Sequence, residues 1–199
     1  MSIQIPPQDY EYDVFFSYKR HPQMLDWTRR VYELFKFQLT LELGGIEARV
    51  FFDEREIEVG QRWPDELRGA IRQSKCLVCI WSPIYFQSTW CVSEWRSFLA
   101  REQALGANEK IQLIAPLKYH DGEHFPQEAR DTQWRDVSEF TSSSPAFWSS
   151  RKALQLEDEL KRFSREVAAI VQSSPTFRAD WPIVEGSAML RPTIPLAKL

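Results

Sequence analysis

The stretch from Cys76 to Trp81 (CLVCIW) constrains the fold most, because it is apolar at every position. A strand with one face in water alternates apolar and polar residues, whereas a continuous apolar run is typical of a strand covered on both faces by helices. Ser82 and Pro83 interrupt the run directly afterwards. We therefore expect a central strand of a parallel sheet here.

Further strands and helices alternate on both sides of this run. The other expected strands are 12–18, 48–52, 111–117 and a short edge strand at 134–137. Strands that alternate with helices are the pattern of a doubly wound parallel α/β sheet, whose ligands bind at the carboxyl ends of the strands. The functional loops are accordingly expected at 19–25, 53–63 and 82–90.

The expected helices are identified by apolar residues at helical spacing and by their end signals. The first begins at Asp26, after Pro22, and stops at Gly44 and Gly45. Pro64 opens the second at its favoured first position. Ser88 or Thr89 caps the third. The last extends over about 146–172.

The length of the chain favours a single domain, and its net charge is close to zero. With 199 residues, 43% of them hydrophobic, the chain can bury roughly two-thirds of its unfolded surface. We expect an N-terminal arm at 1–9, one domain at 10–173, and an extended tail or linker at 174–199, with three prolines after residue 176. The net charge of −3 gives no general attraction to nucleic acid or to an anionic membrane, so neither is an expected partner.

Targeting and metal signals are weak. The first ten residues are polar and no apolar run reaches the roughly 20 residues of a membrane helix, so we expect a soluble, cytoplasmic protein. Cys76, Cys79 and Cys91 are expected as reduced thiols. The Cys76–Cys79 spacing matches half a zinc site, but no second pair follows at ligand spacing, so no metal is expected. His120 and His124 are expected as surface residues of a polar loop.

Familiar phosphate-binding motifs are absent from the sequence. The seven glycines never form Gly-x-Gly, and there is no Gly-Lys-Ser/Thr phosphate loop. A dinucleotide would therefore be a substrate held in a cleft, not a redox cofactor on a glycine-rich turn. Asp13 lies at the start of its expected strand, which is the wrong end for a phosphoacceptor like that of response-regulator receivers.

Three stretches converge on the expected functional loops and carry a family resemblance. The first, 12–20 (YDVFFSYKR), resembles the first box of Toll/interleukin-1 receptor (TIR) domains. The second, 52–63 (FDEREIEVGQRW), resembles the BB loop of that family. The third, 82–95 (SPIYFQSTWCVSEW), follows the Ser-Tyr-Ser-Trp-Cys-x-x-Glu signature of plant and bacterial members. The resemblance covers about residues 10–172 and implies a flavodoxin-like fold with five parallel strands flanked by helices.

The resemblance implies a catalytic residue. In NAD-cleaving TIR domains the glutamate of the signature is catalytic, and the matching position here is Glu94. Cleavage of the nicotinamide–ribose bond builds positive charge on the ribose, so a nearby carboxylate can stabilise the transition state. An isolated glutamate near a helix start is usually a solvated carboxylate favoured by the helix dipole. The signature favours the catalytic interpretation.

The resemblance also implies contacts to the dinucleotide. Trp90 lies one helical turn before Glu94, where its indole can pack on a ring of the substrate or simply belong to the core. Lys19 and Arg20 can offset pyrophosphate charge, whereas Arg62, in the charged BB loop, is as readily a solvated side chain. The full set of expected substrate-binding residues is Ser17, Tyr18, Lys19, Arg20, Asp53, Arg62, Ser88 and Trp90.

The functional expectation is an NAD nucleosidase, either a hydrolase or a cyclase, in immune or antiphage signalling or a cell-suicide pathway. NAD(P) is then the substrate, and no cofactor is expected. The resemblance further implies self-association through the BB loop, with a fused or separate sensor module. The alternative is an adaptor or scaffold that acts only by docking onto other TIR domains. Glu94 discriminates between the two, because docking alone does not need it.

Overall fold

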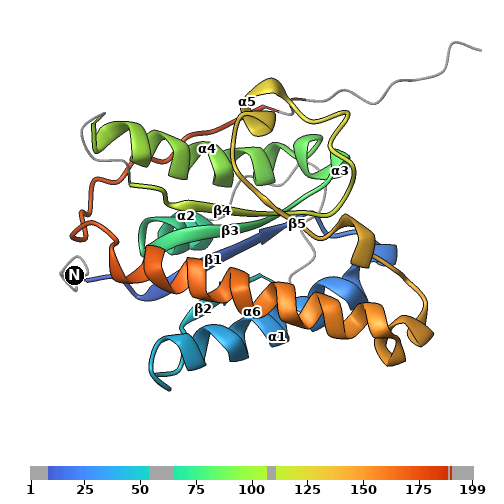
Figure 1. Ribbon diagram of the computed structural model, residues 1–199. Helices are drawn as coiled ribbons and strands as arrows, with labels where there is room; N and C mark the ends of the chain where they lie inside the picture. The colour runs from blue at the N-terminus through green and yellow to red at the C-terminus, as the bar shows by residue number, and fades with distance from the viewer. Residues whose placement is uncertain (1–8, 54–64, 107–110, 188, 190–199) are drawn as a thin grey trace, which may run out of the picture.

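A five-stranded sheet forms the centre of the molecule (Figure 1). The computed structural model describes residues 9–53, 65–106, 111–187 and 189. The strand order is β2-β1-β3-β4-β5, and every neighbouring pair is parallel. The strands are β1 (Tyr12–Tyr18), β2 (Val50–Phe52), β3 (Ser74–Trp81), β4 (Ile114–Lys118) and β5 (Arg135–Asp136). The predicted doubly wound parallel sheet is confirmed.

The apolar run in β3 lies where the sequence predicts. β3 pairs with β1 on one side and with β4 on the other, and every residue from Cys76 to Trp81 is fully buried. Burial on both faces explains why this strand contains no alternating polar residue. It is the central strand.

Helices cover both faces of the sheet (Figure 1). One face is covered by α1 and α6, which pack on Val14 and Phe16 of β1, and the other by α2 and α4, which pack on Phe15. The helices are α1 (Pro22–Glu42), α2 (Asp65–Arg72), α3 (Pro83–Phe86), α4 (Thr89–Ala104), α5 (Gln127–Arg130) and α6 (Arg151–Gln172). Among the described residues, no helix is both long enough and apolar enough to cross a membrane.

Two prolines begin helices where the sequence interpretation placed loops. Helix α1 starts at Pro22, not at Asp26, because proline in the first turn lacks only an N–H that has no helical partner there. Pro83 likewise opens α3, whose cap is Ser82, with its hydroxyl accepting a hydrogen bond from the Tyr85 N–H. The other element boundaries differ from the expected ones by a few residues. For example, β2 begins at Val50 and not at 48.

The chain after α6 contains no helix or strand in residues 174–187. It returns along α4, as the red segment in Figure 1 shows, and its Trp181 is only 1% exposed. These residues, expected as an extended tail or linker, are therefore packed against the domain. Of the stretch that resembles the BB loop, 52–63, residues 54–63 lie outside the described residues.

Candidate active site

Glu94 lies in the second turn of α4, against the carboxyl end of β1. β1 is the strand from which the sheet grows in both directions, to β2 on one side and to β3 on the other. In doubly wound sheets the ligand crevice lies at the carboxyl ends of the strands at such a point. The Glu94 side chain, in a residue only 7% exposed, is thus a buried carboxyl beside the expected crevice.

Ser17 and Tyr85 hold this carboxyl. The Ser17 hydroxyl donates to Glu94 Oε2 at 2.5 Å, and Ser17 Oγ lies 2.8 Å from the Tyr85 hydroxyl. When Glu94 is ionised, the single proton of the Ser17 hydroxyl goes to this carboxylate, and the Tyr85 hydroxyl then donates to Ser17. The three side chains form a directed chain of hydrogen bonds from α3 through β1 to α4, and all three are buried.

Burial dominates the ionisation of Glu94. It raises the pKa of this carboxyl from 4.5 to about 8, although the hydrogen bond from Ser17 acts in the opposite direction. The negative charge of Asp53 raises the pKa further. Glu94 is therefore mainly protonated near pH 7 in the free protein, and a cation bound beside it would favour the carboxylate.

Tyr18 and Asp53 lie together at the rim. The Tyr18 ring stacks on Phe52 with centroids 5.0 Å apart, and its hydroxyl donates to the Asp53 carbonyl at 3.1 Å. The end of β1 is thereby fixed to the end of β2. Lys19 is exposed. Burial raises the pKa of the Cys91 thiol in the first turn of α4, and the positive charge of Lys19 acts against this effect, so Lys19 lies on the same side of the sheet edge.

The start of α4 positions two further expected residues. Ser88 is the N-cap, and its hydroxyl accepts a hydrogen bond from the Cys91 N–H at 3.4 Å. Trp90 is half-buried against the core cluster that contains Trp95, so only part of its indole is open to a ligand. Arg20 is also half-buried, whereas Arg62 lies outside the described residues.

Tyr85 is not among the residues that the sequence predicts for the site. The structure brings its hydroxyl to Ser17, far away in the sequence. Tyr85 is the tyrosine of the same signature that contains Glu94, and this membership was the available signal. A tyrosine among fully buried apolar neighbours needs a partner for its hydroxyl, which is a second signal.

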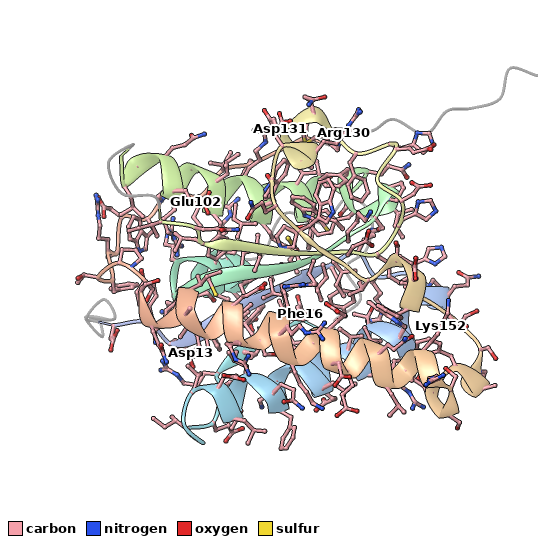
Figure 2. All side chains as sticks on the ribbon, in the orientation of Figure 1. Asp13, Phe16, Glu102, Arg130, Asp131 and Lys152 are labelled. Carbon is pink, nitrogen blue, oxygen red and sulfur yellow. The ribbon has the colours of Figure 1, made fainter. Side chains whose placement is uncertain are left out.

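Asp13 lies toward the amino end of β1, away from the crevice (Figure 2). Burial alone would raise the pKa of Asp13, but hydrogen bonds from Arg49 and Lys75 outweigh it and hold the pKa below its usual value. The Lys75 ammonium is 2.8 Å and the Arg49 guanidinium 3.2 Å from the carboxylate. Asp13 therefore ties β1, β3 and the segment before β2 together at the opposite end of the sheet.

Fold and site together define a doubly wound α/β domain with a buried carboxyl at the carboxyl end of β1. A model of the TIR domain family matches residues 14–151, which is more than half of the chain. The chain belongs to the TIR domain family, as its three sequence stretches predict.

The curated relatives include plant disease-resistance proteins. TMV resistance protein N of Nicotiana glutinosa is 31% identical over 85 residues, which cover 43% of this chain and 7% of that protein. Disease resistance protein RPV1 of Vitis rotundifolia is 28% identical over 114 residues, which cover 57% of this chain and 7% of that protein. The matched part of the chain thus spans about 7% of the length of each of these relatives.

Solved TIR structures are among the matches as well. The TIR domain of the Toll-related receptor TRR-2 of Hydra magnipapillata is 20% identical, with 74% of this chain and 98% of that chain covered and a TM-score of 0.43. The TIR domains of the activated Roq1 resistosome, which directly recognises the pathogen effector XopQ, are 18% identical. That match covers 82% of this chain and 86% of that chain, with a TM-score of 0.40.

Proposed function

We propose that this TIR domain cleaves the nicotinamide–ribose bond of NAD(P) at Glu94. The observation that carries the proposal is the buried Glu94 carboxyl, held by Ser17 at the carboxyl end of β1. A carboxyl with a strongly raised pKa at a ligand crevice is a group suited to chemistry, because a carboxyl that served only solubility would lie in water.

Glu94 would act on the charge that develops as the bond breaks. The nicotinamide ring of NAD is cationic and leaves as a neutral molecule, so the positive charge moves to the ribose. In a buried site the carboxylate attracts this charge more strongly than it would in water. Water or an adenine nitrogen then captures the ribosyl cation and loses a proton, which gives a hydrolysed or a cyclic product.

The raised pKa of Glu94 fits a cationic substrate. In the free protein burial favours the neutral acid. Entry of the nicotinamide cation would offset that cost and draw the group toward the carboxylate, since an opposite charge within a few ångströms favours the ionised form. The site would then develop its negative charge when the substrate is in place.

The surrounding residues would bind the rest of the dinucleotide. Tyr18 and Asp53, joined at the rim, lie beside Glu94 and suit the ribose hydroxyls. Lys19 and Arg20 follow directly and suit the phosphates. The part of Trp90 that is not buried suits ring stacking.

Ser88 already caps α4, so its proposed substrate contact would come in addition to the cap. The proposed contact of Arg62 concerns a residue outside the described part of the chain.

The relation to plant disease-resistance proteins supports a role in immune signalling. We place the proposed NAD cleavage in such a pathway, with activity that depends on self-association through the stretch that resembles the BB loop, 52–63. A non-catalytic adaptor is the second candidate. It is favoured by exposed apolar side chains on and after α1, among them Phe37 and Leu41 one turn apart.

Nicotinamide release by concentrated protein tests the proposal. Glu94→Gln keeps the shape of the side chain and removes its charge, and we expect the rate to fall about 100-fold, equivalent to about 3 kcal/mol. Glu102→Gln is the matched control, because Glu102 is a half-buried acid whose pKa is also raised, near the other end of α4 (Figure 2). Equal and negligible release by all three proteins would favour the adaptor.

A further inference from the structure

α4 is buried almost all round, which is unusual for a helix on the outside of a sheet. Three polar residues of α4, Ser93, Ser97 and Arg101, are spaced one turn apart, and all three are buried. What covers them is the C-terminal strap, which we define as residues 178–187 (Figure 1).

The strap is in register with the helix. The Gly186 N–H donates to Ser93 Oγ at 2.8 Å, and the Val184 N–H donates to Ser97 Oγ at 2.9 Å. Four residues of a helix rise about 6 Å, and two residues of an extended chain span about 6.6 Å, so alternate strap amides meet successive turns. The hydroxyl protons of both serines bond to carbonyls of α4, which leaves their lone pairs for the strap.

Gly186 permits the close approach. A Cβ at this position would lie 2.8 Å from Val92 Cγ1 and 3.2 Å from the Ser93 backbone nitrogen. Both distances are too short for an ordinary side chain, so the backbone lies directly on the second turn of α4. This is the turn that contains Glu94.

Trp181 closes the other end of the strap over a buried cation. Arg101 is fully buried, and its guanidinium donates to the carbonyls of Ser74 and Ile71 at 2.7 and 2.8 Å. The Trp181 ring lies 5.0 Å from this guanidinium, and its indole N–H donates to the Tyr10 hydroxyl at 3.1 Å. Trp181 thus shields the charge that ties α4 to the end of α2 and the start of β3.

The strap and the residues after it also contact the neighbouring helices. Glu185 forms an ion pair with Arg68 of α2. The Met189 N–H donates to the Phe86 carbonyl of α3 at 2.8 Å, next to Tyr85. The segment therefore contacts both α4, which contains Glu94, and α3, which contains Tyr85.

We propose that the C-terminal strap positions α4, and with it Glu94, against Ser17, so that the active site is incomplete without residues 178–187. The catalytic consequence rests on the proposed NAD cleavage, whereas the positioning of Glu94 does not. Ser93, Ser97, Trp181 and Gly186 are positioning residues in this account, since they act through the helix and do not touch the substrate.

A matched pair of glycine variants tests the positioning. Gly186→Ala introduces the Cβ that meets Val92, whereas Gly69→Ala on α2 adds a Cβ with nothing within 4 Å. We expect Gly186→Ala to lower kcat about tenfold with KM for NAD unchanged, and Gly69→Ala to change neither. The Glu94 carboxyl, followed by side-chain ¹³C NMR, should titrate at lower pH in Gly186→Ala as water reaches it.

A cut in the full chain tests whether the strap is held by its contacts alone. A protease site is inserted between Ser174 and Pro175, after α6, and the chain is cleaved in place. The fragment from Pro175 onward should co-elute with the domain, and it should separate when the cut chain also carries Trp181→Ala.

The outcomes separate the two proposals. Retention of the fragment together with a shifted Glu94 titration in Gly186→Ala supports the strap even if the wild-type chain releases no nicotinamide, a result that would overturn only the proposed function. A fragment that dissociates at once would overturn the strap proposal. The same holds if Gly186→Ala is less stable to heat but has unchanged Glu94 titration and unchanged kcat per folded molecule.

Discussion

The Ser17 hydroxyl at the end of β1 donates a hydrogen bond of 2.5 Å to Oε2 of Glu94 on α4. This contact connects the sheet to the helix at the carboxyl end of β1, where doubly wound folds bind their ligands. Both residues are buried, so water does not replace the bond if it is lost. The position of Glu94 and its ionisation are thus both controlled from β1.

Ser17→Ala should raise the pKa of Glu94 above its wild-type value, because the hydrogen bond from Ser17 opposes the effect of burial. It also leaves the buried Tyr85 hydroxyl without its acceptor, at a cost of about 1–3 kcal/mol in the free energy of unfolding. We expect nicotinamide release to fall at least tenfold near pH 7 and to recover partly at higher pH. Rates measured at pH 7 and pH 9 check this, and an equal loss at both would contradict it.

Tyr85→Phe removes one hydroxyl and keeps the packed ring. Ser17 then loses the donor that fixes its orientation, so we expect a several-fold loss of kcat and a destabilisation of about 1 kcal/mol. Tyr12→Phe is the control, because Tyr12 lies at the amino end of the same strand. Steady-state kinetics and urea unfolding of both variants give the comparison, and identical kcat values would exclude a role for the Tyr85 hydroxyl.

The pH profile should follow the carboxylate of Glu94. If the ionised form stabilises the transition state, kcat/KM rises with pH up to about 8, the pKa in the free protein, and then levels off. The charge of Asp53 contributes to this high value, so Asp53→Asn should move the midpoint to lower pH. A midpoint unchanged in Asp53→Asn would show that this charge does not act on the catalytic group.

Stability should depend on pH through the same group. The pKa of Glu94 is raised from 4.5 to about 8 by folding, so the folded protein holds a proton that the unfolded chain releases between these values. The free energy of unfolding therefore falls as pH rises through this window, by up to about 1.4 kcal/mol per pH unit. Glu94→Gln removes this contribution, and its stability relative to wild type should increase from pH 5 to pH 8 in urea titrations. A constant difference would contradict the buried state of Glu94.

Hydrophobic periodicity was enough to predict the fold. The continuous apolar run of β3 indicated a central strand, and β1 lies at the predicted residues. The start of α1 was misplaced because Pro22 reads equally as a loop residue and as a first helical residue. Helix α3 has only four residues, too few to display a period, so the position of Tyr85 could not be predicted.

The site depends on contacts between distant parts of the sequence. Sequence stretches identified Ser17 and Glu94 as candidates, but their hydrogen bond and the role of Tyr85 follow from how β1, α3 and α4 pack. The C-terminal strap gave no signal, because an extended segment without partner strands lacks periodicity. Trp181 could be recognised as a core residue only once Arg101 was seen to be buried beneath it.

The central claim is that Glu94 cleaves NAD, and the most direct test is nicotinamide release per molecule over a range of protein concentrations. The wild-type chain should release nicotinamide at a rate per molecule that increases with concentration as it self-associates, and Glu94→Ala should be slower by about 100-fold at every concentration. Equal and negligible release by both proteins, even in concentrated assemblies, would contradict the claim and leave docking as the function of this domain.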